Sequence, residues 1–226
     1  YYVTNLKMKL LVFDTETTGL PAGRNISVNY VNKWPHIIQL SYILYDTELN
    51  KTCSCVDDII KLDEDVHISA KSIEMHGITR STSMRKGIPI AEAIHNFNNA
   101  LQEADWVIAH NISFDKQMIM VESNRLGIEQ YFSYGNGYGI KEYCTMRNSV
   151  NVCKIEKESA SGKIFHKFPT LTELHMHLFE FTPKNTHDSM SDVLICLRCY
   201  YVLVNEEDVV TKGCGIIRKL YNLYCT

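Results

Sequence analysis

The chain changes its hydrophobic pattern part-way along, from consecutive strand-like segments to an alternation of helix and strand. A buried strand is predicted at 106–109, between two helical patterns at about 89–103 and 114–125. Before it come three apolar or alternating runs that are typical of strands, at 7–14, 37–45 and 52–60. This order predicts an α/β fold that begins as an antiparallel meander.

Two further helices are predicted in the last third of the chain. Thr170 is followed three residues later by Glu173, which is the pattern of a capping box at a helix start, and another helix is expected from about 186 to 204. The glycine- and tyrosine-rich segment 131–143 and the polar segment 155–167 show no periodicity. We expect both to be surface excursions rather than domain boundaries.

The length and composition favour one folded domain covering residues 1–226. A chain of 226 residues with 45% apolar content can bury a full core. It contains no apolar run of about 18 residues and its first residues lack the pattern of a signal peptide, so we expect a soluble, intracellular protein without a membrane partner. The formal charge of −3 argues against coating long stretches of nucleic acid, but it is compatible with holding a strand end.

Eight cysteines raise the alternative of a zinc protein. Such a site would use Cys196, Cys199, Cys214 and Cys225, but these residues have helical or tail settings and lack the paired spacing of zinc knuckles. Without a signal peptide, we expect reduced thiols with structural roles.

Two carboxylates, Asp14 and Glu16, directly follow the first predicted strand. Residues two apart on an extended segment project to the same side, so these groups are expected to converge. Ionised carboxylates that are this close repel each other unless a cation lies between them, which favours a divalent metal site. An ordinary acidic turn is the simpler alternative for this triplet taken alone.

Two later segments supply more polar groups. Asp115 follows His110 and Asn111 at the opening of a helix, where it is either a ligand or a cap that compensates the helix dipole. His187 and Asp192 are five residues apart near another predicted helix start, which would turn them about 140° apart on an ideal helix. The spacing alone does not choose between Asp192 and Asp188 as the functional acid.

The three segments, in this order, resemble the motifs of the DnaQ-like (DEDDh) family of 3′→5′ exonucleases. The first motif is Phe13-Asp-Thr-Glu-Thr-Thr-Gly-Leu20, the second is His110-Asn-Ile-Ser-Phe-Asp115, and the third is formed by His187 and Asp192. Weaker similarities lie between them, and the resemblance covers roughly residues 8 to 203. It implies a ribonuclease H-like fold with a mixed five-stranded sheet, in which parallel strands follow the meander and helices flank both.

The resemblance also implies the chemistry. Two Mg²⁺ or Mn²⁺ ions would be held by four carboxylates, and His187 would act as general base, releasing nucleoside 5′-monophosphates from a 3′ end. It selects Asp192 over Asp188 as the fourth ligand. The four expected ligands are Asp14, Glu16, Asp115 and Asp192.

A substrate site is implied around the terminal nucleotide, although each of its residues could instead be a plain core or turn residue. The expected contacts are Thr17, Thr18, Leu20, His76, Ile78, His110, Asn111 and Phe114. The form of the first motif resembles the proofreading branch, so we expect single-stranded or frayed DNA as substrate and a polymerase or replication protein as partner. The segments 21–34 and 131–143 match no motif.

Two alternatives to a DNA exonuclease stay open. One is a 3′→5′ exoribonuclease, because the sequence offers no test of a contact to the 2′-hydroxyl. The other is a binding module that kept the fold and lost catalysis, although none of the motif carboxylates or the histidine is missing.

Overall fold

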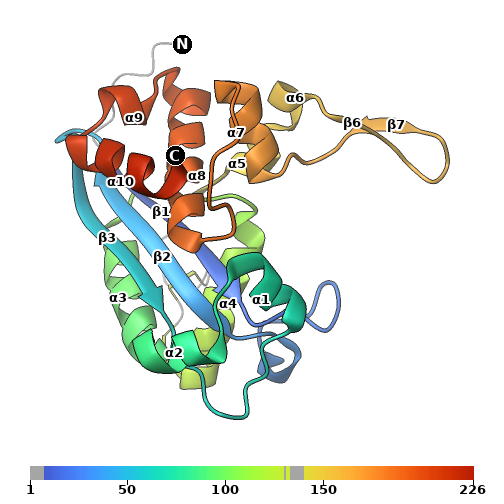
Figure 1. Cartoon of the computed structure of the whole chain (residues 1–226), viewed down its shortest axis with the longest axis vertical. Helices are drawn as coiled ribbons and strands as arrows, with labels where there is room; N and C mark the ends of the chain where they lie inside the picture. The colour runs from blue at the N-terminus through green and yellow to red at the C-terminus, as the bar shows by residue number, and fades with distance from the viewer. Residues whose placement is uncertain (1–7, 130, 133–139) are drawn as a thin grey trace.

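The computed structural model describes residues 8–129, 131–132 and 140–226. Its central feature is a five-stranded sheet with the order β3-β2-β1-β4-β5 (Figure 1). The first three strands pair antiparallel, whereas β4 and β5 continue parallel to β1. The mixed sheet expected from the sequence is therefore confirmed. Its strands are β1 (Lys9–Thr17), β2 (Ile37–Asp46), β3 (Lys51–Ile59), β4 (Trp106–Ala109) and β5 (Lys141–Cys144).

Helices lie on both faces of the sheet and around its ends, and a small hairpin projects from the body. The helices are η1 (Val31–Lys33), α1 (Ala70–His76), α2 (Arg80–Lys86), α3 (Ile90–Glu103), α4 (Ile112–Leu126), α5 (Thr145–Asn148), α6 (Val150–Cys153), α7 (Leu171–Phe179), α8 (Ser189–Asn205), α9 (Val209–Lys212) and α10 (Gly215–Cys225). The hairpin consists of β6 (Glu156–Glu158) and β7 (Ile164–His166). None of the described helices combines the length and apolar character that a membrane crossing requires.

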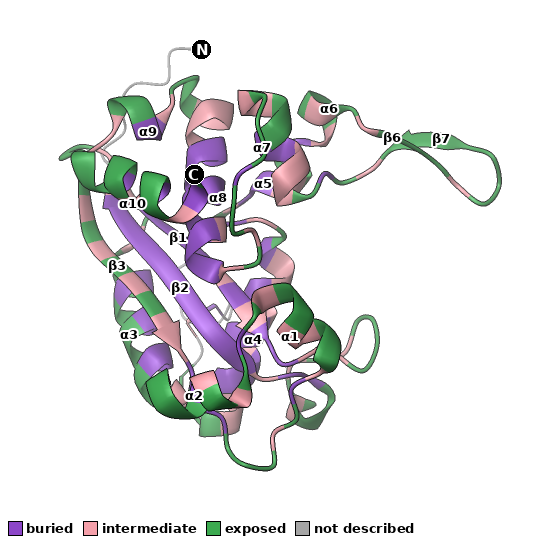
Figure 2. Ribbon diagram, viewed as in Figure 1, coloured by how far each residue is buried: buried purple, intermediate pink, exposed green. Residues whose placement is uncertain are grey.

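The sheet is the middle layer of the molecule because β1 is apolar on both of its faces. Leu11 and Phe13 pack into the core cluster beneath α3 and α4, while Leu10 and Val12 pack into the cluster beneath α8 and α10. Side chains alternate along a strand, so a strand between two helical layers must be apolar at consecutive positions. Figure 2 shows the buried residues running along β1, β2 and the inner side of α8.

Several helix boundaries follow from caps that are visible in the sequence. Thr170 and Glu173 form the predicted capping box at the start of α7. Gly127 ends α4 in the left-handed conformation, with φ of 63°, as expected for the residue after a helix.

The start of α8 corrects the prediction of a helix from about residue 186. The helix begins at Ser189, because Asp188 is its N-cap and two of the three residues before it, Asn185 and His187, have positive φ angles of 53° and 71°. His187 is therefore outside the helix, and the angular separation expected from helical spacing does not apply to it. Strand β1 is also longer than predicted, so that Asp14 and Glu16 lie within it.

Two segments expected to be irregular contain strands. Residues 141–143, predicted as part of a loop, belong to β5 and pair with β4, and the polar excursion at 155–167 is the β6–β7 hairpin. Most of the remaining glycine-tyrosine segment, 133–139, lies outside the described residues.

Candidate active site

Three elements bring the predicted acidic residues to one end of the sheet. Asp14 and Glu16 lie two apart on β1, Asp115 lies in the first turn of α4, and Asp192 lies in the first turn of α8. Both helices begin close to the carboxyl ends of β1 and β4, which is where α/β sheets place their ligands.

Asp115 is fixed in place by strand β1. Its Oδ1 accepts hydrogen bonds from the backbone amide of Thr15 at 3.1 Å and from the Thr15 hydroxyl at 2.8 Å. The residue is 3% exposed. Thr15 stands between the two β1 carboxylates, so these bonds hold the third carboxylate beside the first two.

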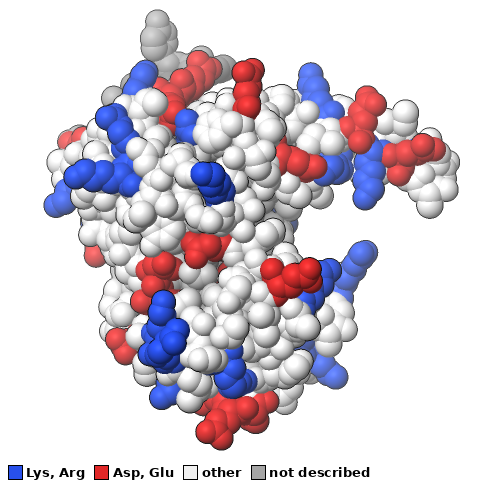
Figure 3. Space-filling view, in the orientation of Figure 1, with Lys and Arg blue, Asp and Glu red and all other residues white. Residues whose placement is uncertain are grey.

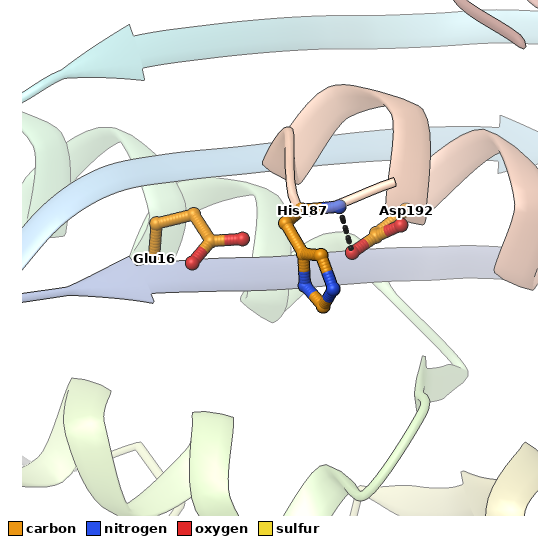
Figure 4. A group of neighbouring side chains, drawn as sticks. All are labelled: Glu16, His187 and Asp192. Carbon is orange, nitrogen blue, oxygen red and sulfur yellow. Dashed lines mark hydrogen bonds between the residues drawn. The ribbon is translucent and has the colours of Figure 1, made fainter. Parts of the chain in front are cut away.

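Glu16, His187 and Asp192 form a group that could hold a metal ion. One ligand atom from each residue lies within 4.8 Å of the others (Figure 4). The backbone amide of His187 donates to Asp192 Oδ2 at 3.2 Å, which couples the loop conformation of His187 to the first turn of α8. The His187 ring points toward the same space as the two carboxylates.

The electrostatics show that the four acids share one environment. Burial, followed by the charge of Asp188, raises the pKa of Asp14 to about 7, and burial with the charges of Asp14, Asp192 and Asp115 raises the pKa of Glu16 to about 9. The pKa values of Asp115 and Asp192 are also well above the ordinary range, chiefly through burial and then through the charge of Asp14. Such mutual repulsion is the condition that a bound cation relieves.

A buried polar network holds the start of α8 against the sheet. Asp188 Oδ1 accepts a hydrogen bond from the backbone amide of Ser191 at 3.1 Å. Asp188 Oδ2 accepts one from the side-chain Nε2 of Gln39 at 3.4 Å. Gln39 Oε1 in turn accepts from the Ser189 amide at 3.2 Å, and the Ser189 hydroxyl donates to the Asp14 carbonyl at 2.8 Å. Asp188 thus serves as a cap, while Asp192 faces the acidic cluster.

A comparison of the sequence with known protein families agrees with the geometry of the acidic site. The sequence model of the exonuclease family RNase_T matches residues 11–200, which is most of the chain. The chain belongs to the RNase_T exonuclease family. The resemblance to DnaQ-like exonucleases is thereby confirmed, and the RNase_T match spans all three motifs.

Solved exonuclease structures share the fold of this RNase_T domain at low sequence identity. Exonuclease I of E. coli in complex with a dA16 oligonucleotide superposes with a TM-score of 0.64 at 16% identity, over 96% of this chain and 43% of that chain. The moderately thermophilic exonuclease I from Methylocaldum szegediense gives 0.65 at 20% identity, over 96% and 42%. A zinc-bound complex of E. coli exonuclease I with single-stranded DNA gives 0.62 at 17% identity, over 96% and 42%.

These likenesses establish the ribonuclease H-like fold. The chain spans less than half the length of the exonuclease I chains that it matches. No curated protein matches it in sequence.

Within this RNase_T domain, four of the residues expected to contact substrate are engaged inside the protein. Thr17 donates its hydroxyl to the Gly19 carbonyl at 2.7 Å, and the Thr18 hydroxyl accepts from the His36 amide at 3.0 Å. Ile78 is buried in a small core cluster. His110 Nδ1 and Nε2 lie 2.9 Å from the Thr145 hydroxyl and 3.1 Å from the Pro169 carbonyl, so both ring nitrogens are occupied.

The other four expected contacts are more accessible. Leu20 is 80% exposed, and Asn111 is exposed in the left-handed conformation at the start of α4, with φ of 67°. Phe114 is partly buried against the core. His76 Nδ1 accepts from the Ile78 amide at 3.0 Å, while its Nε2 is buried without a hydrogen-bond partner among the described residues.

The cysteines do not form a metal site in the described part of the chain. All eight are free, and Cys196 and Cys199 are buried in the core beneath α8. The group of metal-binding side chains that the described residues form contains Glu16, His187 and Asp192, and no cysteine belongs to it.

Sequence reasoning missed the residues that position the acids. Thr15, Gln39 and Ser189 reach the site through hydrogen bonds between elements distant in sequence. The position of Thr15 between Asp14 and Glu16 was the available signal, whereas nothing in the local sequence marks Gln39.

Proposed function

We propose that this domain is a metal-dependent 3′→5′ exonuclease that shortens DNA one nucleotide at a time and releases nucleoside 5′-monophosphates. The observation that carries the proposal is the meeting of four carboxylates from β1, α4 and α8 with His187, in a chain of the exonuclease family. Hydrolysis of a phosphodiester needs charge stabilisation and an activated water, and this set of groups can supply both.

The donor set fits hard divalent cations. Carboxylate oxygens are the ligands that Mg²⁺ and Mn²⁺ prefer, and RNase_T exonucleases generally use divalent metal ions. We infer that Asp14, Glu16, Asp115 and Asp192 hold two such ions. When bound, the cations would lower the pKa of the attacking water and stabilise the attacking and leaving oxygens.

His187 is proposed as the general base. Its ring faces the acidic cluster from an exposed loop, and its backbone amide is held by Asp192. An imidazole nitrogen can take a proton from a water molecule beside the cations, which is the role of a general base. The water oxygen then bonds to phosphorus, the bond to the 3′-oxygen breaks, and this oxygen takes up a proton from solvent, so that the shortened strand leaves with a 3′-hydroxyl group.

Two observations support DNA as the substrate. Structures that share the fold are described as complexes with dA16 and dT13 oligonucleotides, and the first motif resembles the proofreading branch. We propose that Leu20, His76, Asn111 and Phe114 contact the terminal nucleotide, because none of these four residues is fully buried. A single domain over residues 1–226 and a polymerase partner stay predictions.

The test uses matched single strands of DNA and RNA that carry a label at the 5′ end, each with a free or a blocked 3′ end. The proposal predicts progressive shortening of the free DNA strand, with mononucleotides as products and slower hydrolysis of RNA. Faster hydrolysis of RNA would assign the alternative exoribonuclease. Equal cleavage of blocked and free strands would contradict the 3′→5′ direction, and no cleavage of either would favour the binding module.

A further inference from the structure

The β6–β7 hairpin and its flanks, residues 155–167, form an arm that projects from the body beside α7 (Figure 1). In the paired register Lys157 lies opposite Phe165. Backbone hydrogen bonds of 2.9 Å from Ser159 to Lys163 and from Lys167 to Ile155 extend this pairing at both ends. The register therefore assigns each side chain of the two paired segments to one of two faces.

The two faces of the arm have opposite character. Paired residues and residues two apart share a face, so Lys157, Lys163, Phe165 and Lys167 lie together on what we call the basic face. The other face carries two glutamates with Ile164 and His166. Because the glutamates lie on the opposite face, a polyanion that contacts the basic face meets lysines and no carboxylate of the paired strands.

The basic face offers both charge and an aromatic ring to solvent. Phe165, on this face, is 43% exposed. Lys157 and Lys163 are exposed, and no ion pair joins either of them to an acid of the described chain. Lysines interleaved with aromatic rings are typical of surfaces that hold single-stranded nucleic acid, because bases stack on the rings while ammonium groups contact phosphates.

The basic face turns toward the body of the molecule at its base. Lys167 shares this face, and its ammonium lies 2.5 Å from Glu173 Oε1 in the first turn of α7. Lys157 and Lys163 lie further out along the same face. In Figure 3 the surface is hollowed between the arm and the part of the molecule that carries α1, so a strand could pass along this side.

The segment just after the arm is hydrogen-bonded to the turn between β4 and α4. His110 Nε2–H donates to the Pro169 carbonyl at 3.1 Å, and His110 is the first residue after β4, in the turn that leads to Asp115. Burial lowers the pKa of His110 to about 4, so its ring is neutral at physiological pH and Nδ1 accepts from the Thr145 hydroxyl. The bond from His110 to Pro169 ties the segment that follows the arm to the turn that leads to Asp115.

We propose that the basic face of the arm binds the substrate strand on the 5′ side of the nucleotide that is cleaved, with Lys157 and Lys163 on phosphates and Phe165 stacked on a base. The inference rests on the proposed function and adds a second contact for the strand. It assigns the arm to strands of several nucleotides and expects a single nucleotide held in the acidic cluster to leave the arm unoccupied.

The experiment compares the full chain with Lys157→Gln/Lys163→Gln/Phe165→Ala, and with Ile164→Ala/His166→Ala as a matched control on the opposite face. Each is assayed on a 20-nucleotide single strand and on a nitrophenyl ester of thymidine 5′-monophosphate, which contains one nucleotide. We expect kcat/KM of the basic-face variant to fall about 10-fold or more on the long strand, as for the loss of one stacked base. On the one-nucleotide ester, kcat/KM of the basic-face variant should stay within about twofold of the wild-type value. The control variant should stay within about twofold of wild type on both substrates.

Binding of a fluorescent 20-nucleotide strand in EDTA gives a readout that needs no hydrolysis. Each phosphate contact on a single strand contributes about 0.7 to the slope of log K against log salt, so the variant should lower the slope by about 1.4. Unchanged binding and slope in a variant of wild-type thermal stability would overturn the arm proposal and favour a protein partner for this face. If binding depends on the basic face while the wild type hydrolyses nothing, the arm proposal survives and the proposed function fails.

Discussion

The backbone amide and the hydroxyl of Thr15 both donate to Oδ1 of Asp115, a residue 100 positions later in the chain. This pair joins strand β1, which carries Asp14 and Glu16, to the first turn of α4. An acid that accepts two hydrogen bonds from the strand has little freedom to move away from the carboxylates on either side of Thr15. The relationship makes Thr15 a positioning residue for the proposed metal site.

Thr15→Val should reduce hydrolysis by about 10- to 100-fold, the scale found when groups that orient metal ligands are lost. Valine keeps the shape of threonine and the backbone amide, so only the 2.8 Å hydroxyl bond to Asp115 is removed. The concentration of Mg²⁺ needed for half-maximal activity should rise as well. Thr15→Ser retains the hydroxyl and serves as the control, and equal losses in both variants would argue against this role.

Asp188 and Asp192 should respond in opposite ways to replacement by alanine. Asp188→Ala removes the N-cap of α8 and should lower the free energy of unfolding by about 1 kcal/mol, with hydrolysis largely retained. Asp192→Ala should abolish hydrolysis without destabilising the metal-free protein, because it removes a repelling charge. Urea unfolding and mononucleotide release, measured on both variants, would reject the assignment if the two patterns were exchanged.

His187→Ala should lower turnover at neutral pH by about 10²- to 10⁴-fold, the usual contribution of a general base. The side chain is exposed, so the stability of the fold should be unaffected. Turnover is measured at saturating Mn²⁺ and across a range of Mn²⁺ concentrations. A variant that regains full turnover at high Mn²⁺ would show that His187 is a metal ligand instead.

The metal-free protein should become less stable as the pH rises from 6.5 to 8. Glu16 has a folded pKa near 9, above its ordinary value, so across this window the folded state binds more protons than the unfolded state and stability falls with pH. The buried histidines His110 and His175 have pKa values lowered to about 4, so they make the folded state more stable as the pH rises. Most of that gain is complete below the window of pH 6.5 to 8. Melting temperatures in EDTA should fall across the window, and Glu16→Gln should flatten the dependence. A steeper fall in Glu16→Gln would be inconsistent with the account.

The sequence predicts strand β1, two helix boundaries and the chemical groups of the site because their signals are local. The apolar run before Asp14 identifies β1, the pair Thr170 and Glu173 identifies the start of α7, and Gly127 identifies the end of α4. Each of these features depends on residues a few positions apart, which is the range over which side-chain periodicity and capping act.

The parts that escaped prediction depend on contacts that are distant in sequence. Strand β5 is four residues long and half polar, and it is a strand because β4 offers it a partner. The positive φ of His187 is set by the loop that packs before α8, and neighbouring residues do not reveal it. Gln39 reaches the start of α8 across 150 positions, a contact that only the fold creates.

The measurement that most directly tests the four-carboxylate site is mononucleotide release from one single-stranded DNA with a free 3′ end. Wild type and Asp115→Ala are compared in Mg²⁺, in Mn²⁺ and in EDTA, after circular dichroism has shown that both are folded. The account predicts release by the wild type with either metal, no release in EDTA, and none by Asp115→Ala under any condition. Release that persists in EDTA, or that Asp115→Ala performs at nearly the wild-type rate, would contradict it.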